Sequence, residues 1–237
     1  MRILAIESSA ITASVAILTD SVLTAEYTIN YKKTHSQTLL PMIDEICKMT
    51  ETEPESFDLI AVSIGPGSFT GLRIGAATGK GMALALGKDM VAVPTLEAMA
   101  YNVYGSGKVI CPVMDAKRQH LYTGVYDFDE YGALRVIKEQ SLLSYDELCS
   151  ELNALERQVV LLGDGVAVAG EAFKTKLTCG YEIAPAHICT QRAASVAMAA
   201  KVMYERGETI SADKLCPDYL RPSQAEREMS NKLKGGQ

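Results

Sequence analysis

The order of strands and helices expected in the first half of the chain is repeated in the second half. In residues 1–104, the spacing of apolar residues predicts strands at 2–7, 12–19, 23–29, 58–64 and 90–94, and helices at 36–49, 70–86 and 95–104. Residues 105–222 predict strands at 109–115, 120–127, 134–140, 158–164 and 181–185, and helices at 145–155, 166–173 and 191–206. Both halves therefore read β-β-β-α-β-α-β-α. The repeat favours a tandem duplication over the alternative, a single irregular α/β domain.

A duplicated unit of this kind predicts an α/β protein with two tandem ribonuclease H-like lobes, the layout of actin, sugar kinases and heat-shock ATPases. We expect the first lobe at 1–104, a smaller second lobe at 105–222 and a polar C-terminal tail at 223–237. In proteins of this fold class the nucleotide phosphates lie between the lobes. Each half here opens with a strand that ends in an acid, Glu7 or Asp115, and these acids should face that gap.

The composition is typical of an ordinary globular protein, with 48% apolar and 22% charged residues. No segment approaches the roughly 20 uncharged residues of a spanning helix, so we expect a cytoplasmic chain without a membrane partner. The six cysteines stand singly, as buried thiols do in a reducing compartment. The net charge of −6 would repel tRNA on average, so contact with nucleic acid should depend on a partner that carries the basic surface.

Two stretches have the residue types of a phosphate-binding site. The first, "IESSAITASVAIL", offers backbone N–H groups and the hydroxyls of Ser8, Ser9 and Thr12. The second, "GPGSFTGLRIG", places Gly65 and Gly67 before a helix start, which attracts anions. The alternatives are a plain hairpin turn for the first stretch and a strand-to-helix connection with a capped helix for the second.

Support for other chemistry is weaker. Glu7 or Asp115 could hold Mg²⁺ through water beside a phosphate. The stretch "GAATGKG" has three residues between its glycines and no hydroxyl after its lysine, so it does not match a P-loop. The three histidines lie far apart without metal-ligand spacing: His35, His120 and His187. We therefore expect no catalytic residue, no metal site and no cofactor.

The predicted helix at 70–86 has small residues at every fourth position. They form one stripe: Gly71, Gly75, Gly79, Ala83 and Gly87. Glycine weakens a helix by up to about 1 kcal/mol per site relative to alanine, so three interior glycines on one face need a reason. Small residues let another backbone approach closely. The approaching element is either a helix of a partner or part of the same chain, and the sequence leaves both open.

Motifs spread over residues 1–222 are similar to those of one known family. They read "ILAIESS", "HSQTLLPMID", "GPGSFTGLRIG", "PTLEAMA", "PVMDAKRQHLY" and "YLRP". On these motifs the chain resembles the bacterial TsaB family, also called YeaZ, and the glycine-rich motif is the most specific of them. The resemblance implies a noncatalytic subunit of the complex that adds threonylcarbamoyl to the adenosine beside the anticodon, in tRNAs that read codons beginning with A.

The resemblance also implies the partners. In the family, catalysis belongs to the paralogue TsaD, whose metal site includes an H-x-x-x-H pair on the helix that reads "TLEAMAYN" here, without histidine. TsaB pairs with TsaD through helices of the first lobes, the ATPase TsaE joins near that junction, and tRNA binds only through the complex. The resemblance places the partner-binding residues on the helices at 36–49 and 70–86: Leu39, Leu40, Ile43, Gly71, Leu72, Gly75, Thr78, Gly79 and Met82. Without TsaD, we expect a homodimer through the same apolar patch.

The same resemblance bears on the phosphate site. Its six candidate residues form what we expect to be a degenerate nucleotide site: Glu7, Ser8, Ser9, Gly65, Gly67 and Asp115. The first strand ends in Glu7 where members of the family often carry Asp, so ATP binding is not expected. The alternatives are a self-sufficient ATP-dependent kinase or ATPase of the same fold class and a metallopeptidase. The short second half argues against a sugar-kinase pocket, and the scattered histidines argue against the peptidase.

Overall fold

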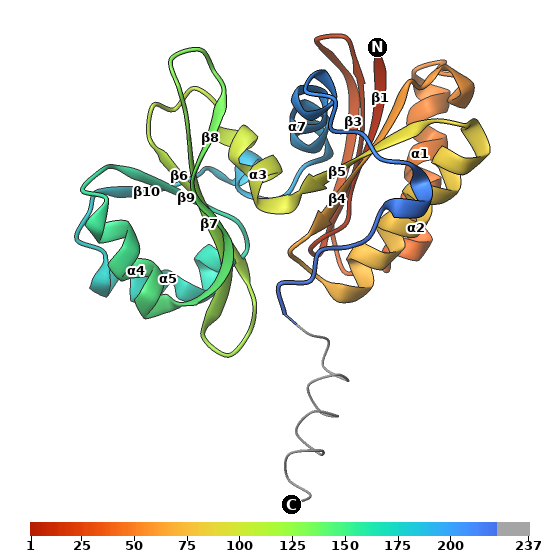
Figure 1. Ribbon diagram of the computed structural model, residues 1–237. Coiled ribbons are helices and arrows are strands. Elements are labelled where there is room, and N and C mark those ends of the chain that lie inside the picture. Colours follow the sequence, from red (N-terminus) through yellow and green to blue (C-terminus); the bar gives the residue numbers. More distant parts are fainter. Residues whose placement is uncertain (222–237) are drawn as a thin grey trace, which may run out of the picture.

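The computed structural model describes residues 1–221 and contains two five-stranded sheets (Figure 1). The first sheet consists of β1 (Arg2–Glu7), β2 (Thr12–Thr19), β3 (Val22–Asn30), β4 (Leu59–Gly65) and β5 (Asp89–Pro94). The second consists of β6 (Val109–Asp115), β7 (His120–Phe128), β8 (Leu134–Ser144), β9 (Val159–Leu162) and β10 (Tyr181–Ile183). The helices are α1 (His35–Met49), α2 (Phe69–Leu86), α3 (Thr95–Ala100), α4 (Tyr145–Ala154), α5 (Gly165–Lys176), α6 (Ala186–Cys189) and α7 (Ala193–Glu205).

The two sheets have the same strand order. The first reads β3-β2-β1-β4-β5, and the second, taken from the corresponding edge, reads β8-β7-β6-β9-β10. In each sheet the opening strand pairs antiparallel with its successor and parallel with the fourth strand of the repeat. The predicted duplication and the two-lobed fold class are confirmed, and the single irregular domain is excluded. The strands expected at 2–7, 12–19 and 109–115 have the predicted bounds.

The first sheet is covered by helices on both faces, as its almost continuously apolar central strands require. On one face, Ile60 and Val62 of β4 pack against Ala76 and Ala83 of α2, and α1 lies beside them. On the other face, the sheet packs against α7. Figure 1 shows α1 and α2 on the side of the molecule that points away from the second lobe.

Helix α7 follows the second sheet in sequence but completes the first lobe. Its Ala193, Val196 and Ala200 are buried against Ala5 and Val91 of the first sheet. Just before the helix, Arg192 forms an ion pair with Glu26 of β3. The predicted second lobe of 105–222 is therefore too long, because the chain returns to the first lobe at α7. Small apolar side chains showed that one face of this helix is buried, but not against which sheet.

The second sheet is also covered on both faces. Leu148 of α4 and Phe173 of α5 belong to the core on one face. On the other face, Leu96 and Met99 of α3 pack with Tyr126 of β7. Helix α3 comes from the first half of the sequence and lies between the two lobes (Figure 1).

After α7 the chain crosses the edge of the first sheet. Met90 of β5 and Ile210 exchange both backbone hydrogen bonds, at 2.9 and 2.8 Å, which covers an edge strand. Ala212 and Leu215 are then buried in the core beside α1 and α2. From there residues 216–221 run toward the gap between the lobes (Figure 1). Within residues 1–221, no helix has the length and apolar character needed to cross a membrane. The tail expected at 223–237 lies outside the described residues.

Candidate functional site: the cleft between the lobes

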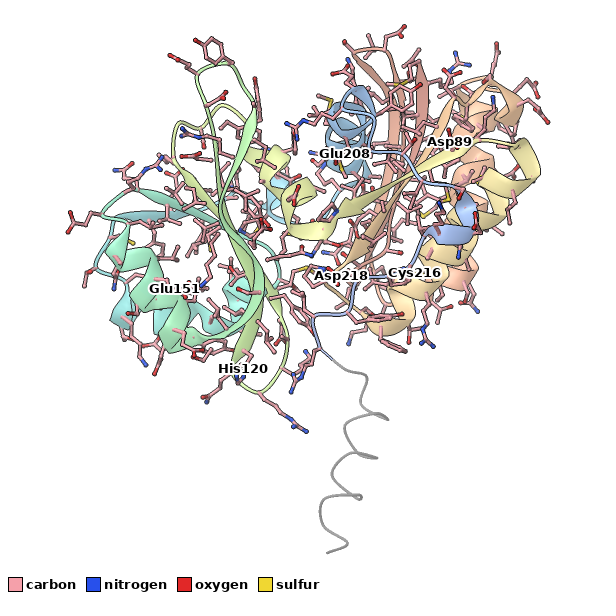
Figure 2. All side chains as sticks on the ribbon, viewed as in Figure 1. Asp89, His120, Glu151, Glu208, Cys216 and Asp218 are labelled. Carbon is pink, nitrogen blue, oxygen red and sulfur yellow. The ribbon has the colours of Figure 1, made fainter. Side chains whose placement is uncertain are left out.

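A cleft of about 600 Å³ opens between the lobes, where β1, β4, β6 and β9 end. Of the six residues predicted for a degenerate nucleotide site, Ser9, Gly67 and Asp115 line it. Figure 2 places Asp218 between the two lobes, and this residue is part of the lining as well. The predicted location between the lobes therefore does hold a cleft, but only part of the predicted residue set reaches it.

The polar groups of the first-lobe wall bind one another. The N–H of Ser68 donates to the carbonyl oxygen of Ser9 at 2.6 Å, and the N–H of Ser9 donates to Oε1 of Glu7 at 2.6 Å. Ser68 Oγ caps α2 by accepting the N–H of Gly71 at 3.2 Å. A Cβ atom on Gly67 would lie 2.3 Å from the Ser9 carbonyl oxygen, so glycine lets this turn close on the hairpin. The N–H groups of Ser9, Ser68 and Gly71 are therefore used within the chain and are not free to bind a phosphate.

Glu7 and Ser8 lie beneath this wall. Glu7 is 1% exposed, and burial raises the pKa of its carboxyl group, although hydrogen bonds from Ser9 oppose the shift. The Ser8 hydroxyl donates to the carbonyl oxygen of Gly71 at 2.9 Å. The expectation that Glu7 faces the gap is therefore wrong, because its side chain turns inward to bind the next turn of its own hairpin.

On the second-lobe wall, Asp115 has a counter-ion from its own loop. Its carboxylate accepts the N–H of Lys117 at 2.8 Å and pairs with Nζ of Lys117 at 2.5 Å. Its own N–H donates to Oδ1 of Asp164 at 3.3 Å. Lys117, Arg118 and Gln119 all have left-handed φ angles, of 64°, 56° and 58°, a conformation that costs energy in residues other than glycine. The loop holds the lysine against the acid at the cleft.

Sequence analysis missed the wall formed by residues 218–221. The N–H of Asp218 donates to the carbonyl oxygen of Ile64 at 2.7 Å. A Cβ atom on Gly65 would lie 2.2 Å from the Asp218 carbonyl oxygen. Gly65 therefore makes room for the end of the described chain and does not line the cleft. The only signal in the sequence was "YLRP", a family motif without local periodicity.

The glycine stripe of α2 faces the chain's own sheet. Cβ atoms on Gly71, Gly75 and Gly79 would lie 2.1 Å from Ser8 O, 2.2 Å from Ser8 Oγ and 2.4 Å from Val62 Cγ2. All three glycines are buried. Of the two explanations that the sequence left open, close packing within the chain is the correct one. The expectation that these glycines contact a partner is wrong.

Three other predicted partner-binding residues, Leu39, Ile43 and Leu72, are also buried, at 1%, 4% and 1% exposure. Leu40 is 57% exposed, and Thr78 and Met82 are partly buried. Six of the nine residues that the resemblance implied for partner binding therefore lie on the buried faces of these two helices. We define the outer face by four exposed small or apolar residues of α1 and α2: Leu40, Ala77, Gly81 and Leu84.

A groove of about 550 Å³ runs between α1 and α2 beside the outer face. Leu40 and Met82 line it from the two helices. Leu84 is the most exposed large apolar side chain of the outer face, at 70% exposure. The outer face thus combines a hollow with protruding apolar side chains, which is the form expected of a surface that binds another helix.

The histidines and cysteines do not assemble a metal site in the part of the chain that the structure describes. Nε2 of His35 lies 2.7 Å from the carbonyl oxygen of Ala10, beneath the first hairpin. All six cysteines are free thiols. Among residues 1–221, no three His, Cys, Asp or Glu side chains gather in a group that could hold a metal ion.

Comparison with known proteins identifies the family. The model of the family "TsaD: tRNA N6-adenosine threonylcarbamoyltransferase" matches residues 23–229. The tRNA threonylcarbamoyladenosine biosynthesis protein TsaB of Bacillus subtilis is 31% identical to this chain over 226 residues, which are 95% of this chain and 96% of that protein. The chain belongs to the TsaB family. Since the TsaD model spans most of the chain, it also belongs to the wider family that this model describes.

Two further relatives agree with this TsaB assignment. TsaB of Escherichia coli is 28% identical over 98% of this chain and 100% of its own length. The solved structure of YeaZ from Pseudomonas aeruginosa superimposes with a TM-score of 0.80 at 24% identity, covering 92% of this chain and 99% of that one. The structural likeness shows that the two share the two-lobed fold.

Proposed function

We propose that this protein is a noncatalytic subunit of the complex that adds threonylcarbamoyl to the adenosine beside the anticodon of tRNA. Relatives named for tRNA threonylcarbamoyladenosine biosynthesis match it over nearly their whole length, which supports a role in that process. The cleft supports the noncatalytic role. The backbone N–H groups of Ser9 and Ser68 and the carboxylate of Asp115 are bound to other groups of the same chain and so are not free to act on a substrate.

The outer face supports a second part of the proposal, that the protein binds a TsaD-type catalytic subunit. Leu40 and Leu84 protrude from it, at 57% and 70% exposure. The small residues Ala77 and Gly81 lie on the exposed side of α2 and would let a partner helix approach closely. The same face would pair two copies of this chain when TsaD is absent, and a TsaE-type ATPase would join beside the junction. The net charge of −6 favours tRNA binding only through the complex.

The second candidate is an ATP-dependent kinase or ATPase. The size of the cleft, about 600 Å³, is in the range of small-molecule sites, and Asp115 stands at its wall. We expect no phosphate release from ATP above a buffer blank, because Asp115 is held by Lys117. Release that is lost in Asp115→Ala would instead favour the kinase.

A reconstituted reaction tests the main proposal. The chain is mixed with TsaD-type and TsaE-type partners, tRNA, ATP and threonylcarbamoyl-adenylate, and modified adenosine is measured by mass spectrometry. We expect product with all components, none from this chain alone, and a large loss when this chain is omitted. Undiminished product without this chain would contradict the proposal.

A further inference from the structure

The end of the described chain crosses the turn at residues 64–69, between β4 and α2, and touches both lobes. We call residues 216–221 the strap. Its start is fixed, because Leu215 is 1% exposed in the core of the first lobe and Ile210 is hydrogen-bonded to Met90. Figure 2 shows Cys216 beside the first lobe and Asp218 between the lobes.

On the first lobe, the strap lies on the turn that carries Gly65. The Asp218 N–H donates to Ile64 O at 2.7 Å, and the Asp218 carbonyl oxygen lies where a side chain on residue 65 would project. Gly65 has a φ of 130°, which few residues other than glycine adopt. The backbone of this turn is therefore shaped to fit the backbone of the strap.

Tyr219 fixes the strap to the start of α2. Its ring stacks on Phe69 with centroids 4.5 Å apart and an interplanar angle of 29°. Arg73 lies over the Phe69 ring at 3.9 Å and donates from Nε to the Tyr219 hydroxyl at 3.0 Å. Aromatic stacking and a cation over a ring are each favourable, so this contact is the main anchor on the first lobe.

On the second lobe, the strap has two separate attachments. Nε2 of Gln140 in β8 donates to Oδ2 of Asp218 at 2.8 Å. Nη1 of Arg221 donates to the carbonyl oxygen of Ala116, next to Asp115, at 2.6 Å. Asp218 by itself thus contacts both lobes. Its backbone N–H binds the first lobe, and its carboxylate binds the second.

From these contacts we propose that the strap is an interlobe clamp, which spans the cleft and holds the two lobes in a fixed relative position. The inference goes beyond the proposed function, since it concerns this chain without any partner.

Hydrogen exchange of the full chain, followed by mass spectrometry, tests the clamp. Tyr219→Ala removes the first-lobe anchor, and Gln140→Ala removes a second-lobe attachment without touching the first. We expect the peptide that covers 216–221 to be protected in the wild type and to exchange about tenfold faster in Tyr219→Ala, the factor that corresponds to ~1.4 kcal/mol of lost contact. Gln140→Ala should also accelerate it, by a smaller factor. Tyr131→Ala, at a residue that is 86% exposed, is the matched control and should leave it unchanged.

Two results would overturn the clamp. A strap that exchanges like an unfolded peptide in the wild type would show that it is not docked. Exchange of the strap that is unchanged in Gln140→Ala would show that it does not bridge the lobes.

Discussion

The two lobes have the same strand order, but the acid at the end of the first strand has a different environment in each. Glu7 of the first lobe is 1% exposed and accepts the N–H of Ser9. Its counterpart, Asp115, lies at the cleft and pairs with Lys117. The duplicated backbone therefore places two carboxylates in equivalent positions, while the neighbouring residues bury one and neutralise the other.

The glycine turns after the fourth strand show what the duplication has kept. A Cβ atom on Gly67 would lie 2.3 Å from Ser9 O, and one on Gly165 would lie 2.9 Å from Val113 O. In both lobes the turn packs directly on the first strand or its hairpin, which only glycine permits. The close packing of this glycine turn on the first hairpin is thus common to both lobes, whereas the environment of the acid at the end of the first strand differs between them.

The largest effect is expected where α2 meets the first sheet. Gly75→Leu with Gly79→Leu would push side chains into Ser8 and Val62. Overpacking costs about 1 to 3 kcal/mol per site, so the free energy of unfolding should fall by roughly 2 to 6 kcal/mol if the costs add. Urea denaturation measures the loss.

Two controls make this prediction specific to the sheet-facing side. Ala77→Leu with Gly81→Leu adds the same side chains to the exposed side of α2, where no atom lies within 4 Å of a Cβ on Gly81. In the second lobe, Gly170→Leu on α5 likewise meets open space. Both controls should fold with wild-type stability or gain up to about 1 kcal/mol from helix propensity. A sheet-facing double variant as stable as these controls would refute the packing described for α2.

The next prediction concerns the pH dependence of folding stability, which should differ between Glu7 and Asp115. Because burial raises the folded-state pKa of Glu7 above its ordinary 4.5, the folded protein binds this proton more tightly than the unfolded chain. Wild-type stability should therefore fall as pH rises from 4.5 through the raised value. Glu7→Gln keeps an oxygen for the Ser9 N–H and carries no charge, so it should be more stable than the wild type at pH 8 and similar at pH 4.

Thermal melts from pH 4 to 8 check this prediction. The matched variant in the second lobe, Asp115→Asn, loses a surface ion pair whose lysine is 80% exposed and should change stability by about 1 kcal/mol at most. If the melting temperatures of Glu7→Gln and the wild type change in parallel with pH, the burial of Glu7 does not lower stability at high pH.

The smallest effect concerns the two hairpin turns. Arg118 in the second hairpin has a φ of 56°, whereas no φ is positive at residues 8–11, all of which the structure describes. Arg118→Gly should stabilise the protein by about 0.5 to 1 kcal/mol, because glycine adopts this conformation without the penalty. Ala10→Gly in the first hairpin should destabilise it slightly. Equal effects in chemical denaturation would contradict the difference between the turns.

The sequence was a good guide where a pattern is local. The strands at 2–7 and 12–19 had the right bounds because each is an apolar run between turn residues. The duplication was also visible, since the order of elements depends on such runs. The stripe at Gly71, Gly75 and Gly79 was visible as well, but a glycine stripe can face either a sheet or a partner helix.

Features that depend on distant contacts were not predictable in this way. The strap has six residues without periodicity, and its contacts reach Gln140 and Arg73, which are 78 and 146 residues away. Helix α7 shows an apolar face in sequence, but nothing local tells which of two similar sheets it covers. A local pattern predicts whether a segment is a helix or a strand, whereas the element that it packs against depends on the whole chain.

The most direct test of the central claim is the affinity of the purified chain for a TsaD-type subunit, measured by isothermal titration calorimetry. Leu84→Asp places a charge on the outer face of α2, and Val168→Asp places the same charge on α5, its counterpart in the second lobe, at a residue that is 49% exposed. Altering a hot-spot residue of an interface costs about 2 kcal/mol or more, so with Leu84 as a hot spot of the outer face, Leu84→Asp should weaken binding about 30-fold or more. Val168→Asp should bind like the wild type. Wild-type affinity in Leu84→Asp, or a loss only in Val168→Asp, would contradict the assignment of the outer face as the partner surface.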